Sequence, residues 1–178
     1  ATPPRARTIG QHKTQPVPRT PRARGIDRTI LLKSQNPLEP LAVAKTLKKI
    51  VEKENPDLIL MGKQAIDDDS NQTGQILSAL LNWPQGCFIS SLKIEGNKVL
   101  ISREIDEGIE NLETKLPAVL TCDLRLNTPR FASLPNIMKA KKKPLDMIDI
   151  DTLEIDTSPK IKTLKVIDPP KRKAGVMV

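Results

Sequence analysis

The side chains with the greatest potential for chemistry lie in residues 62–73, which read GKQAIDDDSNQT. A short apolar run, residues 58–61, precedes this stretch, and residues 74–81 follow it with the apolar spacing of a helix. A strand, a polar loop and a helix start, in that order, form the usual phosphate site of an α/β protein. Side-chain donors from Ser70, Asn71, Gln72 and Thr73 could therefore bind a phosphate, together with the free backbone N–H groups of the first helical turn.

This loop matches no standard phosphate motif, since it lacks the GxxxxGKS/T spacing of a P-loop and the GxGxxG of a dinucleotide fold. Its consecutive carboxylates, Asp67, Asp68 and Asp69, would repel a phosphate. They are better suited to hold a ribose hydroxyl, to cap the helix or to pair with a basic partner. A cluster of N-cap residues without any ligand explains the same pattern equally well, because polar residues are common at helix starts.

Candidate catalytic and metal-binding residues are scarce. Cys87 and Cys122 lie far apart and lack the spacing of a metal site, and His12 is the single histidine. We expect two reduced, buried thiols in an intracellular protein, with one disulfide as the alternative. The sequence therefore predicts no catalytic residue, no zinc site and no Ser-His-Asp triad.

The charge of the 178-residue chain is unevenly distributed. Residues 1–26 carry six basic residues and no acidic one, which leaves 23 basic and 21 acidic residues for the rest of a chain with net charge +8. Two Phe, one Trp and no Tyr leave few side chains for base stacking, so we expect no nucleic-acid partner. No apolar run reaches the roughly 18 residues of a membrane helix, so we expect a soluble protein that does not span a membrane.

Hydrophobic periodicity predicts an α/β fold. Residues 29–33, a helix opened by Asn36 and Pro37, and the apolar strand 58–61 form a strand–helix–strand unit with parallel pairing. After the helix 74–81, alternation in twos over residues 88–94, 99–105 and 109–116 predicts an antiparallel meander, and residues 117–121 predict one more strand. The inward face of the first helix should carry Leu41, Ala44, Leu47, Ile50 and Val51.

The segment after the last of these strands could bind a partner. Residues 127–135 read as a loop, residues 137–143 as a short basic helix, and residues 161–167 as a final strand within an extended tail. Leu134 on a proline-stiffened loop would make a good anchor, and the lysines beside it would attract an acidic partner. From the residues alone, a core leucine beside a solvated lysine run is the more common arrangement.

Two stretches resemble the small (beta) subunit of electron-transfer flavoproteins. GKQAIDDDSNQTGQ resembles the AMP-binding segment of that subunit, and DLRLNTPRFASLPNIMKAKKK, residues 123–143, resembles the recognition loop that docks onto dehydrogenases. The resemblance runs from about Ile30 to Val178 and implies part of a Rossmann-like parallel sheet with an antiparallel extension. It implies AMP binding by Gly62, Lys63, Gln64, Ala65, Ile66, Asp67, Asp68, Asp69, Ser70, Asn71, Gln72 and Thr73.

The resemblance also implies partners and a role. The recognition loop implies Leu134 as the anchor, methylation at Lys139 and Lys142, and a docking set of Leu134, Pro135, Asn136, Ile137, Met138, Lys139 and Lys142. A large (alpha) subunit would hold most of the FAD in a heterodimer, and acyl-CoA and related dehydrogenases of fatty acid beta-oxidation would supply the electrons. The chain would then be an electron carrier and no enzyme by itself, in the mitochondrial matrix or, alternatively, the bacterial cytoplasm.

The N-terminal part departs from the family pattern. Residues 1–26 read as a disordered basic leader, residues 27–144 as a truncated nucleotide-binding domain, and residues 145–178 as an extended C-terminal arm. The family's N-terminal βαβ half is expected to be absent. The chain would then be a fragment or alternative product of the beta subunit, or a degenerate paralogue that serves as a redox-inactive structural subunit of a larger complex.

Overall fold

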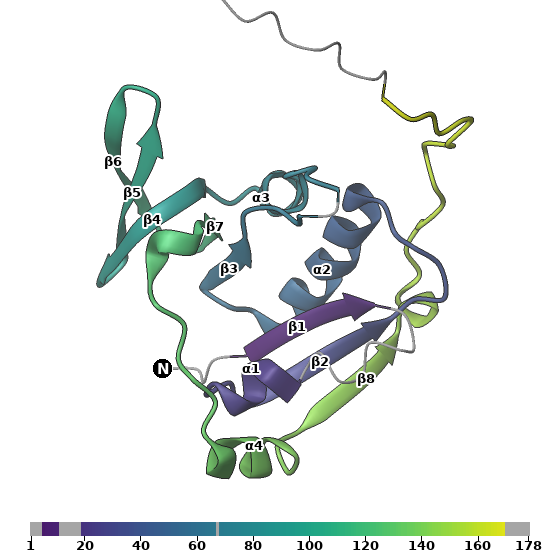
Figure 1. Cartoon of the computed structure of the whole chain (residues 1–178), viewed down its shortest axis with the longest axis horizontal. Coiled ribbons are helices and arrows are strands. Elements are labelled where there is room, and N and C mark those ends of the chain that lie inside the picture. The colour runs from purple at the N-terminus through teal and green to yellow at the C-terminus, as the bar shows by residue number, and fades with distance from the viewer. Residues whose placement is uncertain (1–4, 11–18, 67, 170–178) are drawn as a thin grey trace, which may run out of the picture.

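The computed structural model of the chain describes residues 5–10, 19–66 and 68–169, which form two sheets and the helices that connect them (Figure 1). The first sheet is parallel and has the order β1–β2–β8, with β1 (Arg5–Gly10), β2 (Arg28–Lys33) and β8 (Leu145–Asp149). The second has the order β3–β7–β4–β5–β6, with β3 (Leu58–Gly62), β7 (Ala118–Cys122), β4 (Gln85–Glu95), β5 (Lys98–Ile105) and β6 (Gly108–Lys115). The fold is therefore the expected parallel α/β arrangement with an antiparallel extension.

The first sheet is built around β2, whose central residues Ile30, Leu31 and Leu32 are fully buried. A parallel strand covered on both faces has this continuous apolar sequence. The predicted pairing of residues 29–33 with residues 58–61 is wrong. Because β1 and β8 occupy both edges of β2, the next strand, β3, pairs with β7 in the second sheet instead.

Helix α2 (Pro40–Glu54) packs on the first sheet with one face and on α3 (Thr73–Leu81) with the other. The predicted inward residues Ala44, Ile50 and Val51 are buried, but Ala42 and Thr46 are buried as well. The second contact surface explains this, and the Thr46 hydroxyl is satisfied because it donates to the Ala42 carbonyl at 2.8 Å. The helix begins at Pro40 rather than at residue 36. Proline is favoured at the first position of a helix.

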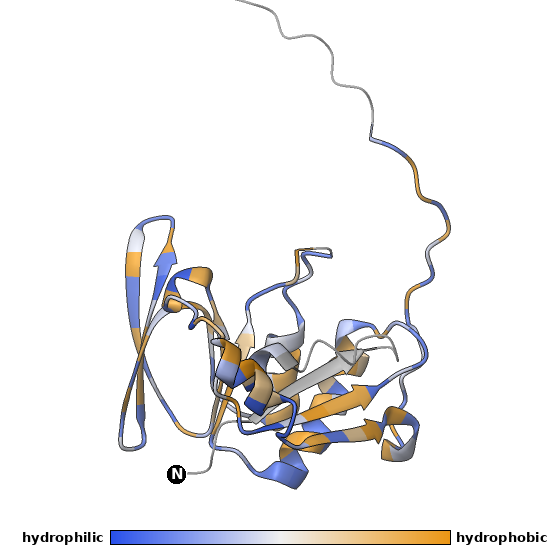
Figure 2. Cartoon of the chain, turned by 60° about the horizontal axis from the view of Figure 1, so that its bottom comes forward, coloured by the Kyte–Doolittle hydropathy of each residue, from blue (hydrophilic) through white to orange (hydrophobic). Residues whose placement is uncertain are grey.

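The second sheet contains the predicted meander, in which β4, β5 and β6 pair antiparallel in sequence order. Strand β7 joins it in parallel to both β3 and β4. The core of this sheet consists of aliphatic side chains: Ile89, Val99, Ile101, Ala118 and Leu120. Figure 2 shows hydrophobic residues concentrated in β2 and β8, whereas the tips of the meander are hydrophilic.

The prediction of a disordered leader over residues 1–26 is wrong for the residues that the structure describes there. Strand β1 pairs in parallel with β2, which satisfies the backbone groups on that side of β1 whatever its side chains are. Helix α1 (Arg19–Ala23) packs against α4 (Leu134–Ala140), and its Ala23 is buried. Residues 1–4 and 11–18, including His12, lie outside the described residues.

The C-terminal segment begins as a strand and ends as an extended chain. Strand β8 and the short helix η3 (Ile150–Leu153) belong to the first sheet and its core, so the predicted arm starts only after residue 153. The strand predicted over residues 161–167 is absent, because no neighbouring strand among the described residues pairs with it. Glu39 fastens this segment by accepting hydrogen bonds from the backbone N–H groups of Lys160 and Ile161, at 2.8–3.0 Å. Residues 170–178 of the predicted arm lie outside the described residues.

Candidate functional site

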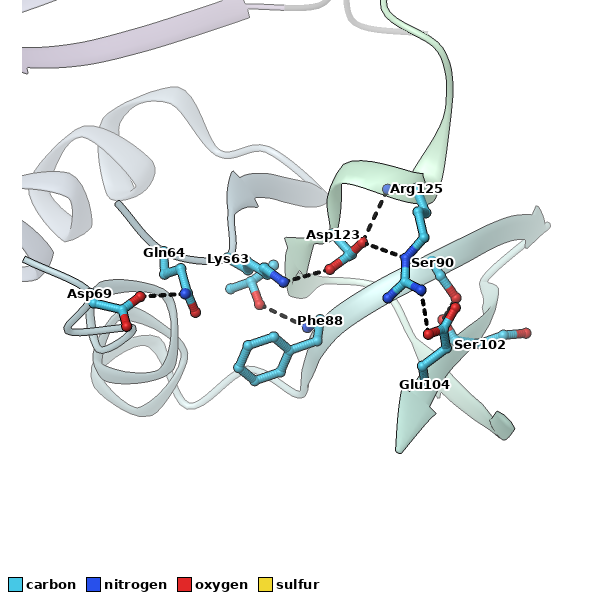
Figure 3. Close-up of polar contacts among 10 residues, drawn as sticks. Lys63, Gln64, Asp69, Phe88, Ser90, Ser102, Glu104, Asp123 and Arg125 are labelled. Carbon is cyan, nitrogen blue, oxygen red and sulfur yellow. Dashed lines mark hydrogen bonds and ion pairs between the residues drawn. The ribbon is translucent and has the colours of Figure 1, made fainter. Parts of the chain in front are cut away.

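The loop of residues 62–73 leaves the carboxyl end of β3, next to the end of β7. This parallel pairing brings Lys63 and Asp123 together, and the Lys63 ammonium donates to Asp123 Oδ2 at 2.6 Å (Figure 3). The same ammonium lies 5.7 Å from the centroid of the Phe88 ring, a cation–π distance. The positive charge at the start of the loop therefore has a fixed position.

Asp123 connects the loop to the meander. Its side chain is 8% exposed and accepts hydrogen bonds from the backbone N–H and the Nε of Arg125, both at 3.1 Å. The Arg125 guanidinium also contacts Glu104 on β5 (Figure 3). The hydrogen bonds from Lys63 and Arg125 hold the pKa of Asp123 well below its usual range, so the carboxylate is ionised at neutral pH.

The carboxylates of the loop make local contacts. Asp68 accepts a hydrogen bond from the Ser70 N–H at 3.2 Å, and Asp69 accepts one from the Gln64 side chain. Asp69 and Asn71 have positive φ angles of 51° and 48°, conformations that Asp and Asn tolerate better than most residues. Ile66 is completely exposed, and Asp67 lies outside the described residues.

Gln72 occupies the N-cap position of α3 without a side-chain hydrogen bond to the helix. The side chains of Asp69 and Asn71 accept hydrogen bonds from Gln64 and Gln75. The predicted N-cap role is therefore wrong for Gln72. The first N–H groups of a helix without a cap need partners from outside the helix, such as water or a bound anion.

Two residues directly after the predicted AMP-binding set, which ended at Thr73, shape the start of α3. Gly74 is buried, and a Cβ atom at this position would lie 2.5 Å from Cγ2 of Thr121 on β7. Gln75 donates to the Asn71 side chain at 2.9 Å, while its Oε1 is buried without a hydrogen-bond partner among the described residues. Only burial distinguishes these two residues from other glycines and glutamines, and burial cannot be read from this sequence.

The second candidate site is the exposed face of α4. Leu134 is the first residue of this helix and is 73% exposed, so the alternative of a core leucine is wrong. The loop predicted through residue 135 ends earlier, because Pro135 suits the first turn of a helix. Ile137 and Met138 are exposed too, so α4 presents an unusual amount of apolar surface. The remaining residues of the predicted docking set are also exposed: Pro135, Asn136, Lys139 and Lys142.

The two candidate sites lie far apart, since α4 is on the opposite side of the molecule from the loop before α3 (Figure 1). Neither contains a catalytic constellation. Among the described residues, no three His, Cys, Asp or Glu side chains are grouped so that they could hold a metal ion. The described helices include none with the length and apolar content to cross a membrane.

The fold and the two candidate sites define a class of protein. It is an α/β protein with parallel strands, a polar loop before a helix, and a separate helix with an exposed apolar face. A model of the electron transfer flavoprotein domain matches residues 4–153. The chain therefore belongs to the electron transfer flavoprotein family. The match begins at residue 4, so the expectation that the first 25 residues lie outside the resemblance is wrong.

Similar proteins are named as beta subunits of electron transfer flavoprotein. The chain is 52% identical over 171 residues to the subunit of Bradyrhizobium diazoefficiens and 51% identical over 175 residues to that of Bos taurus. It is 50% identical over 173 residues to an Arabidopsis thaliana protein named as the mitochondrial beta subunit. Each alignment covers 96% of this chain and 69% of the relative.

Proposed function

We propose that this chain acts as the beta subunit of an electron transfer flavoprotein, an electron-carrier subunit that is no enzyme by itself. The observation that carries the proposal is the identity of 50–52% to beta subunits over 96% of the chain. Its partner would be the large (alpha) subunit, in a heterodimer. FAD held mainly by that subunit would supply the electron-accepting chemistry. The compartment proposed is the mitochondrial matrix, with the bacterial cytoplasm as the alternative, because relatives come from both plants and bacteria.

The proposed role of residues 62–73 is to bind AMP. Free N–H groups at the start of α3 suit a phosphate, and Lys63 brings a positive charge to the start of the same loop. The buried Oε1 of Gln75 needs a donor, which an adenine amino group or a ribose hydroxyl could supply. These features support a nucleotide with few charges better than a triphosphate, because Asp68 and Asp69 lie in the same loop.

AMP content tests this role. The Gln75→Leu variant of the complex with the large subunit should lose AMP affinity by roughly twofold to tenfold, the value of one hydrogen bond. Gln35→Leu, at an exposed position in the loop before α2, is the matched control and should retain AMP. Nucleotide extracted from equal amounts of each purified complex is measured after dialysis. An equal AMP content in both variants would show that Gln75 does not contribute to AMP binding.

The proposed role of α4 is to dock dehydrogenases through Leu134, with Ile137 and Met138 extending the apolar contact. An apolar side chain on a preformed helical turn loses little conformational entropy when it docks. Lys139 and Lys142 would attract an acidic partner, and both are exposed, as a methylation target must be. Methylation would retain their charge while weakening their hydrogen bonds.

The docking role is tested with Leu134→Ala, and Leu124→Ala is the control. Leu124 is also an exposed leucine and lies in the separate helix η2 (Leu124–Leu126). If Leu134 is a hot spot, its variant should bind an acyl-CoA dehydrogenase at least tenfold more weakly, while its flavin content is unchanged. The measurement is the rate of flavin reduction as a function of dehydrogenase concentration. A Leu134→Ala complex that is reduced like the control would refute the anchor role.

A further inference from the structure

A polar cavity lies between α1 and α4. These two helices are on the side of the molecule away from the 62–73 loop (Figure 1). The volume of the cavity is about 150 Å³. None of the described side chains that line it is acidic, and most are basic: Arg22, Arg24, Arg130, Lys139 and Lys143. Like charges gathered around one cavity repel one another, and a bound anion would reduce this repulsion.

Two of the five basic residues hold the cavity together. Arg22 is 5% exposed and donates from Nη1 to the Lys143 carbonyl at 2.8 Å. Lys143 donates in return to the carbonyls of Arg22 and Ile26, at 3.3 and 2.8 Å, and lies 3.5 Å from Asp27. These contacts fix α1 against the end of α4, so the walls of the cavity are preorganised.

The other three basic residues are available for a ligand. The side chains of Arg24, Arg130 and Lys139 make no hydrogen bond or ion pair with the described part of the chain. A Cβ atom on Gly25 would be 3.5 Å from Nη1 of Arg130, so this glycine lies directly beside the guanidinium. Asn136 adds an amide group to the same lining. Donors from α1, α4 and the loop before α4 therefore converge on one cavity.

We propose that this cavity binds a phosphate group. Its volume corresponds to roughly five water molecules at about 30 Å³ each, which is enough for a single oxyanion group. The cavity is open to solvent, so the rest of a phosphate ester could extend beyond it. Two guanidinium groups and an ammonium match a doubly charged phosphate better than a carboxylate, and guanidinium groups bind phosphate oxygens in pairs. The inference does not depend on AMP binding, and it shares only Lys139 with the proposed docking set.

Titration of the purified 178-residue chain with inorganic phosphate tests the proposal, by isothermal calorimetry at low ionic strength in a buffer without other oxyanions. We expect saturable binding of one phosphate per chain. Arg130→Ala should weaken it at least tenfold, because a charge-assisted hydrogen bond is lost. Arg130 is an exposed loop residue, so this variant should fold, which circular dichroism checks.

Lys141→Ala is the matched control, since Lys141 is exposed, lies directly after α4 and does not line the cavity. It should change phosphate affinity by no more than about twofold, as expected of an exposed charge. Equal weakening by both substitutions, or no saturable binding at millimolar phosphate, would overturn the proposal.

Titrations with acetate and with phenyl phosphate identify the class of anion that the cavity binds. Acetate should bind at least about tenfold more weakly than phosphate because it carries half the charge, and equal binding of the two would overturn the assignment to phosphate. Phenyl phosphate tests the source, since Phe131 lies at the same cavity. Tighter binding than inorganic phosphate supports a phosphate ester as the natural ligand, and weaker binding supports free phosphate.

Discussion

Replacing Gly74 with Ala should destabilise the chain where α3 meets β7. The added Cβ would lie 2.5 Å from Cγ2 of Thr121 and 3.8 Å from the sulfur of Met61. The first distance is far inside van der Waals contact, and the Thr121 side chain has little freedom because it is buried and its Oγ1 accepts a hydrogen bond from the Phe88 N–H at 3.1 Å. The helix must therefore move away from the strand.

The net effect combines two opposing terms. Overpacking of this kind costs about 1–3 kcal/mol. Replacing glycine with alanine in a helix returns at most about 1 kcal/mol, and less in the first turn. We therefore expect a net loss of about 1–2 kcal/mol, which lowers the Tm of a chain of this size by roughly 2–8 °C.

Thermal unfolding followed by circular dichroism measures this loss. Gly62→Ala is the matched control, since no atom lies within 4 Å of a Cβ added at that position. Thr121→Ser removes Cγ2 and retains the oxygen that binds Phe88, so it should rescue Gly74→Ala in the double variant. A Gly74→Ala chain as stable as wild type, or a double variant without rescue, would refute the packing argument.

Three further outcomes follow from the polar contacts. The pKa of Asp123 is depressed in the folded state, so its contribution to stability is complete above its unfolded pKa of about 3.9 and is lost as the pH falls below that value. Asp123→Asn should flatten this part of a pH–stability profile, and an unchanged profile would contradict the assignment. Glu39→Gln should weaken the hold on residues 160 and 161, seen as faster proteolysis of the C-terminal segment; unchanged cleavage would show that the segment is held elsewhere. Burial raises the pKa of the Cys122 thiol, so Cys87 should react first with a thiol reagent near pH 8, and equal rates would argue against that burial.

Elements with strong periodicity could be predicted from the sequence. The alternation over β4, β5 and β6 and the apolar stripe of α2 gave these elements correctly, because each pattern reflects burial of one face. The partners of β2 could not be predicted. Its pairing with β8 joins residues more than 100 positions apart, and its pairing with β1 joins residues 23 positions apart; local patterns do not reveal either pairing.

Strand β1 shows a second limit. Backbone hydrogen bonds to β2 hold a strand in which only Thr8 and Ile9 are of residue types enriched in strands. The residues of the candidate sites also fall into those that the sequence reveals and those that it does not. The 62–73 loop and Leu134 stand out by residue type, whereas Gln75, Asp123 and the cavity beside α1 depend on burial and on distant contacts.

Native mass spectrometry of the chain purified with its partner from the source organism tests whether it is an electron-carrier subunit. We expect a heterodimer that contains this chain, a larger subunit, one FAD and one AMP. A chain found alone or in an assembly without flavin would contradict the role of an electron-carrier subunit and would favour a redox-inactive structural role.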